Sequence, residues 1–150
     1  MRKTDYRYPF SPFPSGWFAV GFVADITAVQ IMTLSYFGRE LIAFRNGENK
    51  ICVLNAYCVH LGAHLGVGGR LENGCVICPF HSWKFDSQGQ CIEIPYSDHI
   101  PDRGKIHAYP VIEWAGMIIV YFRPDNPAPV SRPDLPQFDP LQWTLHDSRR

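Results

Sequence analysis

The chain has 150 residues, 46% of them hydrophobic and 19% charged, which is the composition of one globular domain with its own core. Fourteen Lys and Arg residues balance fourteen Asp and Glu residues, so the chain has no electrostatic footprint for nucleic acid or an anionic membrane surface. The longest apolar runs, such as MIIVYF at 117–122, are far shorter than the ~20 residues of a membrane span. We therefore expect neither a nucleic-acid partner nor a membrane span.

The N-terminal sequence MRKTDYRYPF lacks the apolar region of a secretory signal, and we expect a cytoplasmic protein. Five cysteines are an odd number, and a disulfide framework is not expected in a reducing compartment. Thiols that cluster with histidines in such a compartment are more often metal ligands or catalytic groups. We therefore consider the cysteines as candidate metal ligands before any other role.

The chain begins with prolines among aromatic residues at 1–16, which predicts an extended arm. Short β-type runs follow at 17–23, 31–37, 40–45 and 50–55, with turn chemistry at Asn46-Gly47. Beyond the Cys/His region, a hairpin is predicted over 82–96, and residues 105–122 supply two more strands with a turn near Ala115-Gly116. No helical apolar period persists for three turns. The pattern predicts an all-β fold, an antiparallel sandwich or small barrel.

The composition changes at Arg123, because residues 123–140 contain six prolines in eighteen positions. A packed strand or helix does not tolerate so many prolines, so we expect a stiff linker or a segment strapped to the domain surface. The predicted organisation is an N-terminal arm at 1–16, one domain at 17–122, and a proline-rich linker with a C-terminal tail at 123–150.

Two mixed pairs, Cys58-x-His60 and Cys78-x-x-His81, lie in loops rich in glycine or containing proline. Zinc would take all four side chains on one tetrahedral ion. A Rieske [2Fe–2S] cluster would place two thiolates on one iron and two imidazoles on the other. Zinc fingers group Cys with Cys and His with His, whereas each loop here supplies one of each, which favours the cluster.

The run CVHLGAHLG…CPFHSWKFD resembles the Rieske domain of the Rieske non-haem iron oxygenases. The wider pattern HLGAHLGVGG…CPFHSW…G.C..IPY is most similar to the branch of Neverland-type cholesterol 7-desaturases and ketosteroid hydroxylases, over roughly residues 17–122. The resemblance implies a Rieske-type antiparallel sandwich or small barrel with a cluster-binding subdomain inserted at 56–85. It also implies a [2Fe–2S] cluster, with Cys58 and Cys78 on the inner iron and His60 and His81 on the outer one.

The resemblance further singles out four residues beside the ligands, namely Gly62, Pro79, Ser82 and Trp83. Ser82 departs from the pattern, which usually has glycine there, and Trp83 is expected to pack beneath the cluster. Respiratory Rieske proteins join their two loops by a disulfide, and the matching positions here are Ala63 and Phe80. Without that bridge, we expect a potential at the lower end of the Rieske range of about −150 to +300 mV.

His64 follows His60 by four residues, a spacing that faces one metal ion only on a helix. In this glycine-rich loop we expect it to be a solvated or hydrogen-bonding residue. Cys52, Cys75 and Cys91 are offset from the ligand pairs, and we expect them to pack in the core as small hydrophobic residues.

A Rieske cluster transfers single electrons and does not itself activate O₂. By resemblance, that step needs a mononuclear iron on two histidines and a carboxylate, and His146 with Asp147 cannot form this triad alone. We therefore expect an oxidoreductase component without catalytic residues, which does not catalyse oxygenation by itself. Its donor is a reductase or ferredoxin, and its acceptor is a mononuclear-iron oxygenase domain or subunit.

Three interpretations follow from these residues. The first is the N-terminal Rieske domain, excised or split, of a sterol- or steroid-type Rieske oxygenase whose mononuclear iron site is not in this chain. The second is an autonomous Rieske ferredoxin that serves a separate oxygenase. The third is a zinc-binding interaction module. The arm and the proline-rich linker favour the first, because a self-contained ferredoxin needs neither.

Overall fold

The computed structural model describes residues 13–124 and 131–137, and their regular structure is almost entirely β. None of these residues forms a helix long and apolar enough to span a bilayer. The elements are β1 (Gly16–Phe22), the 3₁₀ turn η1 (Val23–Asp25), β2 (Met32–Tyr36), β3 (Arg39–Arg45), β4 (Ile51–Asn55), β5 (Arg70–Glu72), β6 (Cys75–Ile77), β7 (Lys84–Phe85), β8 (Cys91–Glu93), β9 (Ala108–Tyr109), β10 (Val111–Trp114) and β11 (Met117–Phe122). The predicted all-β class is confirmed.

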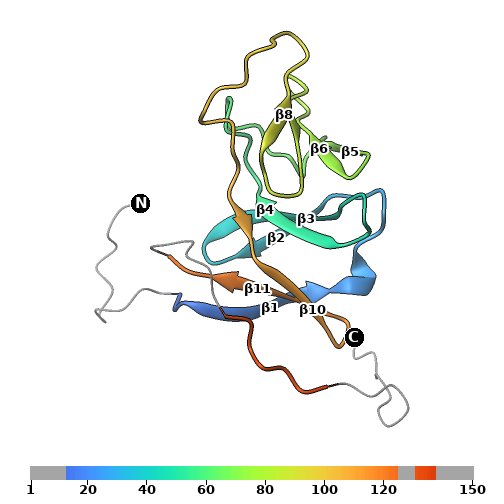
Figure 1. The fold of residues 1–150 in the computed structure, drawn as a ribbon, viewed down its shortest axis with the longest axis vertical. Helices are drawn as coiled ribbons and strands as arrows, with labels where there is room; N and C mark the ends of the chain where they lie inside the picture. The colour runs from blue at the N-terminus through green and yellow to red at the C-terminus, as the bar shows by residue number, and fades with distance from the viewer. Residues whose placement is uncertain (1–12, 125–130, 138–150) are drawn as a thin grey trace.

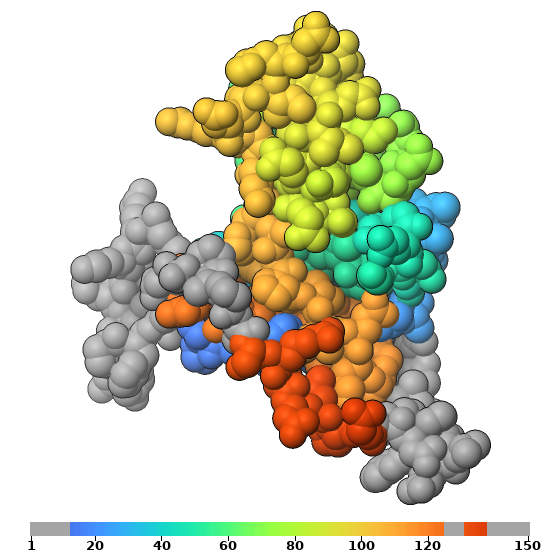
Figure 2. Space-filling model, viewed as in Figure 1, coloured from blue at the N-terminus to red at the C-terminus, as the bar shows by residue number. Residues whose placement is uncertain are grey.

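The strands form three antiparallel sheets, which lie one above another in Figure 1. The lower sheet has the order β1-β11-β10, the central sheet β2-β3-β4-β9, and the upper sheet β5-β6-β7-β8. Figure 2 shows the yellow and green residues of the upper sheet and its loops as a separate lobe above the other two sheets. The predicted sandwich with an inserted cluster-binding subdomain is therefore confirmed.

The central sheet is buried on both faces, and β3 shows why. Its residues 41–44, Leu-Ile-Ala-Phe, form a continuous apolar run without polar alternation. Residues i and i+2 of a strand share a face. Ile42 and Phe44 pack into the upper core, between the central and upper sheets, and Leu41 and Ala43 pack into the lower core, against β1 and β11. One strand thereby serves two cores.

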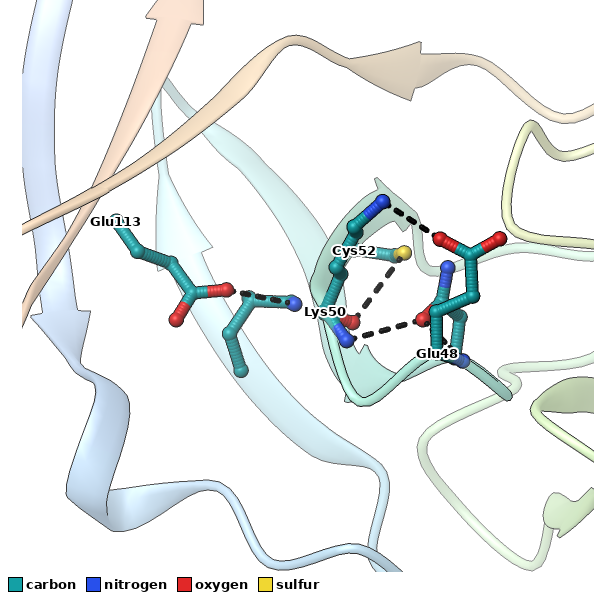
Figure 3. Close-up of polar contacts among 6 residues, drawn as sticks. Glu48, Lys50, Cys52 and Glu113 are labelled. Carbon is teal, nitrogen blue, oxygen red and sulfur yellow. Dashed lines mark hydrogen bonds and ion pairs between the residues drawn. The ribbon is translucent and has the colours of Figure 1, made fainter.

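A side chain from β10 connects the lower sheet to the start of β4. Oε1 of Glu113 accepts a hydrogen bond from the main-chain N–H of Ile51 at 3.0 Å, and Figure 3 shows this contact beside the turn that precedes β4. A main-chain amide at the end of a strand needs a partner when it is not exposed to water. The carboxylate supplies that partner and ties the two sheets together.

The predicted turn between β3 and β4 is present, although its glycine does not make it. Oδ1 of Asn46 accepts hydrogen bonds from the N–H groups of Glu48 and Lys50, both at 3.0 Å. The left-handed residue is Asn49, with φ of 62°. Because the Asn46 side chain binds the main chain in this way, the connection is a longer turn than the two-residue hairpin turn that Asn46-Gly47 predicts.

The hairpin of β5 and β6 was not predicted, and it turns at Asn73-Gly74. Both residues have positive φ, 51° and 73°, as a two-residue type I′ turn requires. A Cβ on Gly74 would lie 2.0 Å from the amide nitrogen of Gly47, so this hairpin packs closely against the turn after β3. The Asn-Gly dipeptide between short apolar runs was the signal for it.

Part of the proline-rich segment lies against β10. The indole N–H of Trp114 donates a hydrogen bond to the carbonyl oxygen of Pro136 at 3.0 Å. Residues 131–137, orange-red in Figure 1, run beneath the lower sheet. The prediction of an arm over 1–16 and the histidine-aspartate pair at 146–147 fall mostly or wholly outside the described residues.

We expect Phe44→Ala to lower the free energy of unfolding by about 3–5 kcal/mol, because it removes a fully buried ring from the upper core. Urea unfolding followed by circular dichroism measures this loss. The matched control is Val29→Ala, where the side chain is 86% exposed and a change within about 0.5 kcal/mol is expected. Equal losses in the two variants would contradict the placement of Phe44.

Candidate metal centre

The loops that begin at Cys58 and Cys78 have the same main-chain hydrogen bonds. In both, the cysteine N–H donates to the carbonyl five residues later, at 2.9 Å. The cysteine carbonyl accepts from the amide four residues later, Gly62 in one loop at 2.9 Å and Ser82 in the other at 3.1 Å. The two loops are therefore structural equivalents.

Gly62 and Ser82 hold the equivalent place in the two loops, and both have positive φ, 72° and 59°. The left-handed conformation costs a residue with a Cβ about 1–2 kcal/mol. Glycine avoids this cost, which explains why the pattern of the family usually has glycine where this chain has Ser82. Ser82, which replaces that glycine, therefore holds a strained main-chain conformation.

The two cysteines of these loops are buried next to each other in the upper core. Burial raises the pKa of the Cys58 thiol to about 11, and the neighbouring Cys78 thiol acts in the same direction, while the main-chain amides of His60 and Leu61 oppose it. A thiol must lose its proton to bind a metal. Metal binding at Cys58 therefore releases a proton from a site that otherwise keeps it.

The imidazole rings of His60 and His81 face each other, with centroids 4.8 Å apart and an angle of 68° between the rings. Nδ1 of each ring is buried and has no hydrogen-bond partner among the described residues. A buried polar atom left without a partner costs about 1–3 kcal/mol. Two imidazoles that bind a metal through Nδ1 leave these two nitrogens without a hydrogen-bond partner in the protein, as observed here.

These side chains fit a [2Fe–2S] cluster, because two neighbouring thiols and two neighbouring imidazoles form separate pairs. A Rieske cluster needs only two protein ligands on each iron. In residues 13–124 and 131–137, no three His, Cys, Asp or Glu side chains are grouped so that they could hold one ion. Two thiols and two imidazoles are the donor set of such a two-iron centre.

Aromatic rings enclose the imidazoles. The buried ring of Trp83 lies parallel to His60, with centroids 4.6 Å apart and an angle of 6°. Phe80 covers His81 at 4.4 Å between centroids. Pro79 is exposed and lies beside Gly68 of the other loop, where a Cβ would come within 3.4 Å of it. The residues predicted beside the ligands thus fix the rings and the approach of one loop to the other.

The ring of His64 makes one hydrogen bond and one longer polar contact within the protein. Its Nδ1 accepts the N–H of Gly66 at 3.1 Å, and its Nε2 lies 3.8 Å from Oε2 of Glu40. The hydroxyl of Tyr57 donates to the same carboxylate, and this hydrogen bond raises the pKa of Tyr57. His64 is therefore a hydrogen-bonding residue that ties the first loop to β3.

The remaining cysteines differ in their surroundings, and all five cysteines of the chain are free. Cys91 is buried in the upper core, and Cys52 packs against that core. Burial raises the pKa of the Cys52 thiol to about 11. Cys75 is half-buried and belongs to neither core. The prediction of core packing is therefore confirmed for Cys91 and Cys52 and wrong for Cys75, which stands at the first position of β6 beside the Asn73-Gly74 turn, while the next two residues of that strand are buried.

Comparison with protein families matches residues 16–110 to the Rieske [2Fe-2S] domain. The chain belongs to this family. It therefore binds a [2Fe–2S] cluster, which decides between the cluster and zinc, the choice that the ligand types alone left open. As a Rieske domain, the chain transfers electrons.

The relatives of this Rieske domain are oxygenases and desaturases. It is 38% identical over 116 residues to the cholesterol 7-desaturase nvd of Drosophila melanogaster, covering 77% of this chain and 27% of that protein. It is 31% identical over 135 residues to the oxygenase component of the 3-ketosteroid-9-alpha-monooxygenase of Rhodococcus rhodochrous, covering 88% and 34%. The chain thus spans about a quarter to a third of the length of these relatives.

Solved structures show the same fold. The structure of dicamba monooxygenase matches with a TM-score of 0.72 at 25% identity, covering 82% of this chain and 38% of that one. A reduced complex between oxygenase and ferredoxin in carbazole 1,9a-dioxygenase matches with a TM-score of 0.69 at 28% identity, covering 84% and 33%. The expected Rieske-type fold is confirmed.

Sequence reasoning missed Tyr96 beside the centre and Glu40 beside the first loop. Tyr96 accepts a hydrogen bond from the indole N–H of Trp83 at 2.7 Å, and Glu40 receives the hydroxyl of Tyr57 and faces His64. Tyr96 stands in the IPY run that carries part of the resemblance, which was a signal for it. Glu40 lies on a strand far from the loop in sequence, and nothing in the sequence indicates the contact.

We expect Ser82→Gly to retain the cluster and to raise the free energy of unfolding by up to about 1 kcal/mol, because glycine relieves the left-handed strain. Ser82→Val should lose iron, because a β-branched residue is an outlier at this φ. Iron content and urea unfolding measure both variants. If Val were tolerated as well as Gly, the main-chain explanation of this position would be wrong.

Proposed function

We propose that Cys58 and Cys78 bind the inner iron of the cluster and that His60 and His81 bind the outer iron through Nδ1. The observation that carries this proposal is the pair of buried, unpartnered Nδ1 atoms beside the two buried thiols. When bound, the cluster accepts and donates one electron at a time. Gly62 and Ser82, both with positive φ, give the two loops the same main-chain turn.

The four proposed ligand side chains differ in their exposure to solvent. The thiols are buried, whereas the two histidines are partly exposed. The imidazole side is therefore the side nearest to solvent, and electrons enter and leave through it. Trp83 and Phe80 hold the two rings at this surface.

The surface around the imidazoles is apolar, and we call its four residues, Val59, Leu61, Val67 and Phe80, the tip surface. Their side chains are between 42% and 70% exposed. Residues 57–69 and 78–83 contain no Asp, Glu, Lys or Arg. Exposed apolar side chains gathered in one place mark protein interaction sites. The tip surface supports docking of a protein electron partner at the imidazoles.

We propose that the donor is a reductase or ferredoxin and that the acceptor is a mononuclear-iron oxygenase domain or subunit. The complex of oxygenase and ferredoxin in carbazole 1,9a-dioxygenase supports the first part. The cholesterol 7-desaturase and ketosteroid monooxygenase relatives, of which this chain spans only a fraction, support the second. The chain then supplies the Rieske part of a sterol- or steroid-type oxygenase.

The ligand assignment predicts that His81→Ala abolishes the Rieske EPR signal of the dithionite-reduced protein, because the outer iron loses one of its two protein ligands. The wild-type protein should hold about two irons per chain and give the rhombic signal. The matched control is His64→Ala, in which both the iron content and the signal should persist, because His64 binds Gly66 and faces Glu40.

Either of two results contradicts this assignment. One is an unchanged EPR signal in His81→Ala. The other is loss of iron in His64→Ala, which would make His64 a ligand or an essential support of one. Circular dichroism of both variants shows that each is folded.

Partner docking predicts that the double substitution Leu61→Ser and Phe80→Ser slows reduction by a protein donor about tenfold, because apolar contact at the tip surface is lost. Stopped-flow reduction by a reduced plant-type ferredoxin measures the rate. Reduction by dithionite, which needs no docking surface, should not change. Val29→Ser, at a residue 86% exposed on the loop after β1, is the control. Equal effects with both reductants would mean that the substitutions alter the cluster and not docking.

A further inference from the structure

We infer that Tyr96 is a positioning residue that fixes the two imidazoles of the outer iron; this rests on the ligand assignment proposed above. The hydroxyl of Tyr96 accepts a hydrogen bond from the indole N–H of Trp83 at 2.7 Å. The ring of Tyr96 also meets His81 edge-on, with centroids 6.5 Å apart and an angle of 77°. Tyr96 thus reaches both halves of the imidazole pair.

Tyr96 reaches His60 through Trp83. The indole lies parallel to the His60 ring at 4.6 Å, so the plane of the indole determines the plane that this imidazole can adopt without losing the contact. Trp83 is buried, and its N–H is its only polar group. A buried donor without a partner is unfavourable, so the hydroxyl of Tyr96 selects the orientation of the indole.

Core packing does not account for Tyr96, because 60% of its side chain is exposed. It stands in the turn after β8, where the N–H of Ser97 donates to the carbonyl of Ile94 at 3.2 Å and where Ile94 is buried in the upper core. Pro95 fixes the main chain just before it. The main chain is therefore held firmly at a residue whose side chain lies largely outside the core.

Removing the hydroxyl of Tyr96 leaves the donor of Trp83 unpaired and frees the indole to reorient. The His60 ring then loses its parallel neighbour, and the angle between the imidazoles is no longer fixed. Residues that orient metal ligands affect both the electronic structure of the centre and its retention of metal. The effect of Tyr96 is therefore expected in spectroscopy and in cluster lifetime, while the fold is kept.

The test is Tyr96→Phe in the cluster-loaded protein. We expect shifted EPR g values, a changed reduction potential and a cluster half-life in EDTA shortened about threefold or more. Tyr109→Phe is the control, because this tyrosine of the lower core also loses a hydroxyl hydrogen bond, to Oδ1 of Asn55. It should leave the g values and the half-life unchanged.

A double-mutant cycle shows whether Tyr96 acts through the indole. Trp83→Phe keeps an aromatic ring near His60 but has no N–H, so adding Tyr96→Phe to it should change the g values and the half-life no further. The inference is overturned if Tyr96→Phe behaves as Tyr109→Phe does, or if its effect is the same in both backgrounds. Absence of a Rieske signal in the wild-type protein is a separate outcome, which would overturn the ligand assignment and this inference together.

Discussion

Two adjacent buried imidazole nitrogens, without hydrogen-bond partners among the residues that the structure describes, are the constraint on which the rest of the structure depends. Most buried polar atoms have a partner, so an adjacent pair without one calls for an explanation, and a bound metal supplies it. The surrounding main chain must then be satisfied without their help, and the matching hydrogen bonds of the two loops do this from Cys58 and Cys78 onward. The need for a left-handed residue at one place in each loop follows from that pattern.

The central sheet makes these loops possible. The strands of the upper sheet are two or three residues long, too short to form a stable sheet alone. They are held because Ile42 and Phe44 of β3 supply the wall of the upper core in which the two ligand cysteines are buried. The contacts of His64 and Tyr57 with Glu40 add a polar attachment at the same strand. The first loop is thus fixed to the central sheet from both its core side and its surface side.

The sequence predicted features that depend on local chemistry and missed those that depend on contacts between distant segments. Apolar runs and turn residues located the longer strands, and the spacing of Cys58, His60, Cys78 and His81 indicated the centre. The role of Glu40 comes from a contact across seventeen positions, and that of Tyr96 from one across thirteen; no periodicity reports either. The reason for glycine at the place of Ser82 also needed the observed φ, because a loop pattern does not give dihedral angles.

The arrangement around the imidazoles separates two tasks. Trp83 and Tyr96 fix the rings from within and from the side, while the tip surface meets the solvent with apolar side chains and without charges. Charged rims accelerate encounter and select partners by sign, whereas an uncharged rim gives little long-range steering. A partner that docks at the tip surface, as proposed above, would therefore be selected at short range, by fit. A rigid imidazole pair suits that mode of recognition, because a partner that docks by shape meets the electron port in one fixed geometry.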